Sequence, residues 1–149
     1  MAAGQEPAED LGLAVLMFIS YRAMETQILD AVREAGFPIT VAQARVAARI
    51  NEDGSRLTEL AEAAQMTKQN AGFIVGQLLD QGYVERVPDP RDARAKLIRI
   101  TALGDRVRRL ARDTELRVEA EWLEVLGESG AANLRTALET LRTVTDPYR

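Results

Sequence analysis

The sequence has 149 residues, of which 46% are hydrophobic and 28% are charged, and this composition predicts one globular domain with a buried core. It contains neither cysteine nor histidine. This excludes disulfides, thiolate metal sites and imidazole general bases, so most hydrolase and metalloenzyme classes lose the side chains on which they depend. We expect no metal, no cofactor, no catalytic residues and no enzymatic activity.

The charge is distributed unevenly along the chain. Residues 1–65 hold 5 basic and 10 acidic side chains, residues 66–112 hold 10 and 5, and residues 113–149 hold 4 and 8, which gives −5, +5 and −4. The basic middle segment is a candidate phosphate-facing surface, although a solvated charged face would give the same count. Because no stretch of about 18 apolar residues occurs and the N-terminus is acidic, we expect a cytoplasmic protein with no membrane partner.

Apolar residues at helical spacing predict the first two helices. The first is long, covers about residues 10–35 and ends at a Gly-Phe-Pro sequence. The second begins at Thr40, which forms a capping-box pattern with Gln43, and it ends near Ile50. Residues 51–54 have the sequence Asn-Glu-Asp-Gly, which predicts a turn.

Two short helices are predicted after this turn. Ser55 is the expected N-cap of the first, which ends near Ala64. Thr67 is the expected N-cap of the second, which continues to about Gln81. Gly82 then stops this helix, because glycine readily adopts the left-handed conformation that follows many helix C-termini.

The apolar period changes from 3.6 to 2 after the fourth helix, which indicates strands. Residues 83–87 and 95–100 are predicted to form one β-hairpin around a polar turn at residues 88–94. Thr101 then caps a long fifth helix to about residue 126. Gly127 to Gly130 break it, and a last helix covers residues 131–144.

This order of elements predicts a mainly α fold with a two-stranded β-wing, namely a winged helix-turn-helix with N- and C-terminal dimerisation helices. The terminal helices are more amphipathic than so small a core requires, and their spare apolar faces predict a homodimer. We interpret the chain as a single winged-helix regulator domain. The domain covers residues 1–149. Its dimerisation helices are at 10–35 and 103–145, and its DNA-binding lobe is at 40–101. Within the lobe, the recognition helix is at about 67–81 and the wing at about 84–100.

Four short motifs occur in order along the lobe. They are Glu59-Leu60-Ala61, then Leu78 with Gly82-Tyr83-Val84-Glu85-Arg86, then Asp89-Pro90-Arg91-Asp92-Ala93-Arg94-Ala95, and finally Ile100-Thr101-Ala102-Leu103-Gly104. With the chain length and the helix layout, the segment from Leu57 to Gly104 resembles the MarR family of winged helix-turn-helix transcriptional regulators. The resemblance implies a homodimer with interlocked terminal helices, two recognition helices in successive major grooves of a pseudo-palindromic site, and wings toward the minor groove.

Some positions depart from the family pattern. Members often carry a basic or hydroxyl residue where this chain has Gly72 and Phe73, and an arginine where it has Ala93. Gly72 and Gly76 should each weaken the recognition helix by roughly 1 kcal/mol relative to alanine. Close approach of the helix backbone to DNA, or close packing against another helix, would compensate for that cost.

The outward side of the recognition helix supplies candidate contacts to duplex DNA. Gln69 and Asn70 can pair bidentately with adenine edges, whereas Lys68 is expected to contact phosphate. Phe73 can touch a thymine methyl group, although Phe is more often partly buried. The full set of candidates on this helix is Thr67, Lys68, Gln69, Asn70, Phe73 and Gln77.

The wing supplies the remaining DNA candidates, Arg91, Arg94 and Lys96. We expect one of the two arginines to insert into the narrow, electronegative minor groove. Asp92 repels phosphate, so we expect it to hold the wing structure by bonding turn amides or an arginine. Arg86 is expected either to contact the DNA backbone or to belong to a buried structural pair.

Family logic also implies release from DNA by a small aromatic or phenolic ligand. Phe18, Tyr21, Arg22 and Trp122 are the candidate ligand residues, although aromatic residues at helical spacing are more often core or dimer interface. Two other functions stay open. One is a winged-helix protein–protein interaction module without specific DNA binding; the other is an enzyme that uses Glu115, Glu119 and Glu121 of the fifth helix.

Overall fold

The chain forms helices α1 to α4, a two-stranded antiparallel sheet and a long final helix α5, and a computed structural model describes residues 10–146. The acidic N-terminus, which is one of the two reasons for expecting a cytoplasmic protein, lies almost wholly outside the described residues. The mainly α fold with a two-stranded β-wing is confirmed. The elements are α1 (Leu13–Glu34), α2 (Val41–Ala47), α3 (Leu57–Ala63), α4 (Lys68–Asp80), β1 (Val84–Asp89), β2 (Asp92–Ile100) and α5 (Ala102–Thr145).

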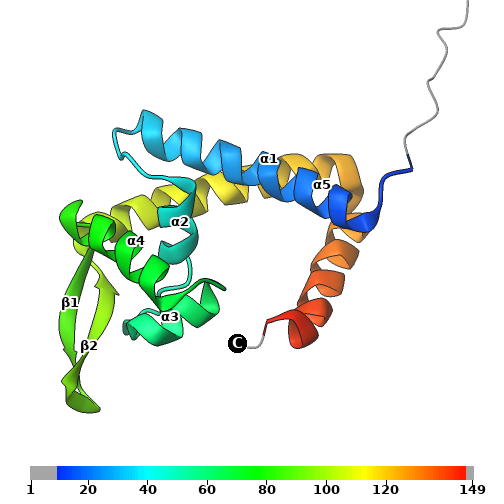
Figure 1. Cartoon of the computed structure of the whole chain (residues 1–149). Helices are drawn as coiled ribbons and strands as arrows, with labels where there is room; N and C mark the ends of the chain where they lie inside the picture. The colour runs from blue at the N-terminus through cyan, green and yellow to red at the C-terminus, as the bar shows by residue number, and fades with distance from the viewer. Residues whose placement is uncertain (1–9, 147–149) are drawn as a thin grey trace, which may run out of the picture.

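Helices α2 to α4 and the β-hairpin form one lobe, and the long helices α1 and α5 run side by side away from it (Figure 1). The hydrophobic core lies mainly in the lobe, where Val46, Leu60, Val75 and Leu78 are fully buried. Only the C-terminal half of α1 reaches this core, through Val32. The helices therefore hold the lobe at one end and extend well beyond it at the other.

The predicted N-caps are present at three of the four helices for which the sequence predicts one. The Thr40 and Gln43 side chains each accept a hydrogen bond from the other residue's backbone N–H at 3.1 Å, which completes the capping box. Thr67 accepts a hydrogen bond from the backbone N–H of Asn70 at 3.2 Å and so begins α4. Gly82 has φ +76° and ends α4, as its position predicts.

The predicted cap of the third helix is wrong. Ser55 is not an N-cap, because its backbone N–H and C=O pair with Ile98 of β2 at 2.9 and 2.8 Å. Arg56 is the N-cap instead, and its backbone N–H donates to the carboxylate of Glu59 at 3.1 Å. Helix α2 ends at Ala47, which is earlier than predicted. Between α2 and α3, the chain therefore pairs with β2 of the wing through this single bridge.

The hairpin is longer and its turn shorter than the sequence predicts. The pairing of the two strands extends outward to Asp89 and Asp92, and its register shifts between Pro88 and Asp89. Only Pro90 and Arg91 remain as the tip. Polar residues near a turn carry no strand signal, so the sequence predicts turn where the outer wing is in fact strand.

Helix α5 contains the predicted break, but the break is a single residue. Gly127 has φ 72° and ψ 165°, and helix continues on both sides of it, so residues 128–130 are helical rather than irregular. After this kink the chain turns away from α1 and runs back toward the lobe, in orange to red in Figure 1. There, Asp146 forms an ion pair with Arg49 at 3.1 Å. Across residues 10–146, no helix is both long and apolar enough to cross a bilayer.

Hydrogen bonds and a close backbone contact hold the start of α5 against the base of the wing. The Thr101 hydroxyl donates to the carbonyl of Gly82 at 2.6 Å and accepts from the backbone N–H of Gly104 at 3.1 Å. A Cβ at Gly104 would overlap the carbonyl oxygen of Tyr83. Glycine is therefore required for this contact between helix and strand.

Candidate nucleic-acid interface

Helix α4, the predicted recognition helix, buries one face and exposes the other. Ala71, Ile74, Val75 and Leu78 form its buried stripe. Residues 67–70, which include the candidates Thr67, Lys68, Gln69 and Asn70, are all exposed. The first turn of the helix thus presents its polar side chains to solvent, as the predicted DNA contacts require.

Phe73 also lies on the outward face, with 68% of its surface exposed. Gln77 differs from this arrangement. Its amide oxygen accepts a hydrogen bond of 3.1 Å from the buried Gln43 of α2, and the residue is half-buried. Gln77 therefore joins α4 to α2, a tertiary role that helical periodicity does not reveal.

The two glycines of α4 have different surroundings. A Cβ at Gly72 would meet the Leu57 side chain of α3 at 3.6 Å, an ordinary van der Waals contact. A Cβ at Gly76 would meet no described atom within 4 Å. Neither position needs glycine for packing within residues 10–146, although each glycine costs the helix roughly 1 kcal/mol relative to alanine. The packing alternative is thus not supported inside this chain.

A buried carboxylate organises the wing tip. Asp89 is 1% exposed and accepts hydrogen bonds from the backbone N–H of Arg91 at 2.9 Å and from the Arg56 guanidinium of α3 at 2.8 Å. The Arg91 side chain adds bonds of 3.2 and 3.3 Å to the same carboxylate. The backbone and side-chain bonds from Arg91, followed by the bond from Arg56, hold the pKa of Asp89 well below its usual range.

This arrangement was missed by sequence reasoning, which treated Asp89 as part of a polar turn. The alternation of the strand indicates that Asp89 faces inward, because it follows the half-buried Val87 at a spacing of two residues, but it does not indicate the partner Arg56. Arg91, a predicted minor-groove residue, is held by Asp89 although its side chain is 67% exposed. Asp92 has the expected kind of role, because its carboxylate accepts from the backbone N–H of Arg94 at 3.0 Å.

Four cations of the interface have no partner inside the chain. Lys68, Arg86, Arg94 and Lys96 form neither an ion pair nor a side-chain hydrogen bond within residues 10–146, and all four are exposed. Every other arginine in that range is engaged by a carboxylate, a backbone carbonyl or an aromatic ring. The unpartnered positive charges therefore lie on α4 and the wing. Because Arg86 is exposed, the prediction of a buried structural pair there is wrong.

A second buried carboxylate joins α1 to α2. Glu25 of α1 is 8% exposed and receives two hydrogen bonds from Arg45 of α2, at 2.8 and 3.1 Å. Tyr21 and Arg22 donate to the same carboxylate at 2.8 and 2.9 Å. The bonds from Arg45 outweigh the burial of Glu25 and hold its pKa below the ordinary value. Tyr21 and Arg22, two of the predicted ligand residues, are therefore occupied by an internal partner.

The other two predicted ligand residues are not part of this cluster of bonds. Phe18 is 60% exposed on α1, and Trp122 is half-buried on α5. None of the four lines the open pocket of about 1220 Å³ that lies between the wing, α3 and the end of α2. A ligand site at these residues stays a prediction.

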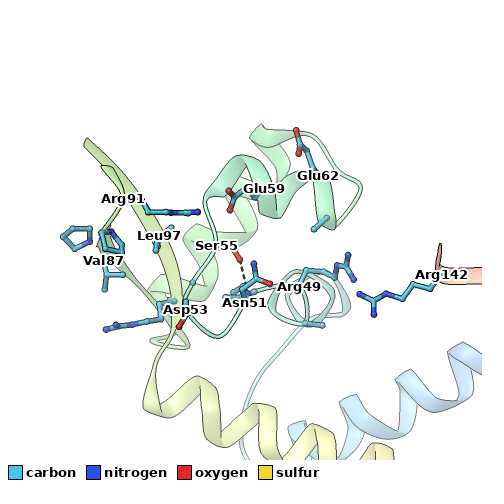
Figure 2. A pocket seen from close by; sticks show the side chains of 17 residues that line it. Arg49, Asn51, Asp53, Ser55, Glu59, Glu62, Val87, Arg91, Leu97 and Arg142 are labelled. Carbon is cyan, nitrogen blue, oxygen red and sulfur yellow. Dashed lines mark hydrogen bonds between the residues drawn. The ribbon is translucent and has the colours of Figure 1, made fainter. Parts of the chain in front are cut away.

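The arginines that line that pocket are each paired with a carboxylate outside its lining. Figure 2 shows Arg91 extending from the wing toward Glu59 of α3, while Arg142 of α5 points toward Arg49. Arg49 and Arg142 each form an ion pair of 3.1 Å with Asp146. The pocket thus offers no unpaired arginine to a ligand.

The carboxylates considered for an enzyme are part of surface ion pairs on α5. Glu115 pairs with Arg112 and Glu121 with Arg117, each at 2.7 Å, and Glu119 pairs with Arg135 at 3.0 Å. Across residues 10–146, no cluster of three acidic side chains could hold a metal ion.

The sequence profile of the MarR family matches residues 37–95, which cover α2 to α4 and most of the wing. Over these residues, which are less than half of the chain, the sequence is similar to the MarR family. The fold of the chain is that of MarR-family transcriptional regulators, which are not a family of enzymes. The predicted resemblance and the predicted fold class are both confirmed.

Three known proteins illustrate this similarity to the MarR family. The transcriptional activatory protein BadR of Rhodopseudomonas palustris is 29% identical over 94 residues, which are 63% of this chain and only 53% of BadR. The structure of transcriptional regulator Tm0710 from Thermotoga maritima has a TM-score of 0.61 at 26% identity and covers 88% of this chain and 91% of its own. The structure of a mutant MepR of S. aureus bound to an oligodeoxyribonucleotide has a TM-score of 0.58 at 17% identity, covering 91% and 99%.

Proposed function

We propose that this protein is a member of the MarR family, binds duplex DNA as a homodimer and regulates transcription. The observation that carries the proposal is the set of unpartnered cations on α4 and the wing, Lys68, Arg86, Arg94 and Lys96. A cation that is already paired gains little from a phosphate, because it must give up its partner. Unpaired exposed cations can neutralise phosphates and release the counterions that drive DNA binding.

Dimerisation is supported by apolar side chains that no part of the described chain covers. On α1, Leu13, Leu16 and Phe18 are 68%, 48% and 60% exposed. On α5, Leu138 and Leu141 are 49% and 45% exposed. Apolar residues exposed along α1 and along the distal part of α5 mark a surface for another chain. A second copy would bring two α4 helices to the two half-sites of a pseudo-palindromic site.

Five of the DNA candidates receive a role from their positions. Gln69 and Asn70 face the bases from the first turn of α4, and Lys68 reaches phosphate. Arg94, which has no internal partner, is the arginine that enters the minor groove. Arg91 instead acts through Asp89 by holding the wing in shape.

The same proposal divides residues 1–149 into dimerisation helices at 10–35 and 103–145 and a DNA-binding lobe at 40–101. It includes a location in the cytoplasm, as expected from the sequence. The oligodeoxyribonucleotide bound by the S. aureus MepR mutant supports DNA as the partner of this fold. The proposal includes release from DNA by a small aromatic or phenolic ligand, which rests only on the resemblance to the MarR family.

Selection from a pool of random duplexes tests this function. We expect enrichment of a two-fold symmetric site of roughly 16–20 base pairs, whose affinity falls steeply as salt rises. Gln69→Ala should weaken binding to the selected site more than to random DNA. Arg117→Gln, on the surface of α5, is the matched control and should leave binding unchanged.

One observation favours a second function, a protein-interaction module, because Phe73 exposes an apolar ring on the outward face of α4. The selection separates the two. If no sequence is enriched and no duplex binds even at low salt, DNA binding is refuted and a protein partner for α4 becomes the better explanation.

A further inference from the structure

The outward face of α4 combines an aromatic ring with a bare backbone. Gln69 and Phe73 are one turn apart, and Gly76 follows three residues later, so these three residues share one face of the helix. Phe73 is 68% exposed, and a Cβ at Gly76 would point into open space. The centre of this face therefore holds an apolar ring, and at Gly76 no side chain covers the helix backbone.

We propose that this face selects thymine. The Phe73 ring contacts the 5-methyl group of one thymine in each half-site, and the bare Cα of Gly76 lets α4 lie deep enough for that contact. The inference rests on the DNA binding proposed above and specifies which base edge the helix reads.

The chemistry of the groove points to this partner. In the major groove of B-DNA, the thymine methyl is the apolar group that the base pairs present, and the other edges offer hydrogen-bond donors or acceptors. A phenyl ring cannot pair with donors or acceptors, but contact with a methyl group removes apolar surface of both partners from water. Gln69, one turn before the ring, can pair with the adenine edge of a neighbouring base pair.

Charge and size favour DNA over a protein partner for the same face. Lys68 on the same helix and Lys96 on the wing carry unpartnered positive charge. Phe73 is the one large apolar side chain that α4 exposes, which is far less than the apolar centre of a stable protein interface. Asp80, exposed one turn after Gly76, repels phosphate and limits the contact to the N-terminal part of the helix.

The test uses the selected duplex with thymines replaced one at a time by deoxyuridine, which lacks only the 5-methyl group. We expect one position in each half-site where the replacement lowers affinity about fourfold, the factor expected for one buried methyl-sized group. Phe73→Ala should bind the thymine and uracil duplexes equally. Because the ring is exposed, this variant should keep the thermal stability of the unsubstituted protein.

Two glycine variants provide the matched pair. Gly76→Ala should lose the thymine preference, because its new Cβ stands between helix and base. Gly72→Ala should keep it, because its Cβ would face Leu57 of α3 instead.

The outcomes separate this inference from the proposed function. Sequence-specific binding with no sensitivity to uracil at any position, or a uracil effect that persists in Phe73→Ala, would overturn thymine reading while leaving DNA binding intact. Absence of all duplex binding would overturn both.

Discussion

The guanidinium of Arg56, at the start of α3, donates a hydrogen bond of 2.8 Å to the buried carboxylate of Asp89, near the tip of the wing. The two residues are 33 positions apart, so this bond joins two parts of the lobe that the sequence separates. Arg91 approaches the same carboxylate from the turn. The wing is thus held against α3 by a carboxylate that must stay ionised.

Asp89→Asn should destabilise the protein and loosen the wing. The substitution removes the negative charge that both arginines share and leaves them facing a neutral amide. Thermal unfolding at pH 7 should show a lower midpoint than for the unsubstituted protein. Asp92→Asn is the control, because Asp92 is exposed and accepts only the turn bond from Arg94.

The same contact predicts a pH dependence. The pKa of Asp89 is lowered in the folded state, so its contribution to stability is fully present above the unfolded-state pKa of about 4 and is lost as the pH falls below it. The difference in unfolding free energy between the unsubstituted protein and Asp89→Asn should therefore shrink below about pH 4. A difference that stays constant down to about pH 2 would contradict this account.

Local sequence signals predicted most of the fold. The Thr40–Gln43 capping box, the Thr67 cap and the turn at Gly82 each depend on residues within a few positions of one another, and all three are present. The change of apolar period located the wing, and Gly127 located the break in α5. These features are set by nearby backbone geometry, which sequence patterns report directly.

The errors arose where a distant partner decides the structure. Ser55 has the residue type of an N-cap, but Ile98 of β2 binds its backbone. Gln77, whose contact with a base stays a prediction, has a second role that the sequence does not show, because Gln43 of α2 binds its side chain. Nothing in the sequence around Asp89 indicates that Arg56 pairs with it, because such a pair exists only once the lobe is packed.

The link between α1 and α2 should depend on Arg45 more than on Arg22. Arg45 makes two bonds between helices to the buried Glu25, whereas Arg22 makes a bond within α1. Arg45→Met should lower the free energy of unfolding by about 1–3 kcal/mol, the range for hydrogen bonds to charged groups. Arg22→Met should cost under about 0.5 kcal/mol, as within-helix pairs do.

A double-mutant cycle with Glu25→Gln, measured by chemical denaturation, separates the two arginines. It should give a coupling energy with Arg45 that is larger than the coupling with Arg22. Equal couplings would show that Glu25 is anchored within α1 alone.

Two glycines should respond to alanine in opposite directions. Gly104→Ala should destabilise the protein by about 1–3 kcal/mol, because its Cβ would overlap the Tyr83 carbonyl and force the wing and α5 apart. Gly76→Ala should stabilise it by about 0.5–1 kcal/mol, because its Cβ meets nothing and alanine favours helix. Thermal or urea unfolding of both variants measures the effect, and two changes of the same sign would refute the contrast.

Unpartnered cations should set the salt dependence of DNA binding. Each phosphate contact contributes about 0.9 to the slope of log affinity against log salt. Because each substitution removes one contact from each subunit of the proposed homodimer, Lys68→Gln and Lys96→Gln should each reduce that slope by about 2. Arg135→Gln should leave it unchanged, because Arg135 is paired with Glu119 on α5. Titrations at several salt concentrations provide the slopes. If the lysine variants keep the original slope, these side chains do not contact phosphate.

Dimerisation should fail when charge enters the exposed apolar face of distal α5. Leu138 is 49% exposed and lies one turn from Leu134 and Leu141, which are 43% and 45% exposed. Leu138→Glu would bury an unpaired carboxylate in a dimer interface but would leave the monomer fold untouched, so it should weaken dimerisation by at least about tenfold. Thr136→Glu is the control, because residue 136 lies on the opposite side of the helix.

Sedimentation velocity across a dilution series measures this effect, with circular dichroism confirming that helix content is retained. The proposed function also requires that Leu138→Glu lose affinity for the full two-fold site more than for a single half-site, since only the dimer engages both halves at once. A dimer as tight as that of the unsubstituted protein would show that this apolar face serves another contact, and α1 would then be the surface to test, beginning with Leu16.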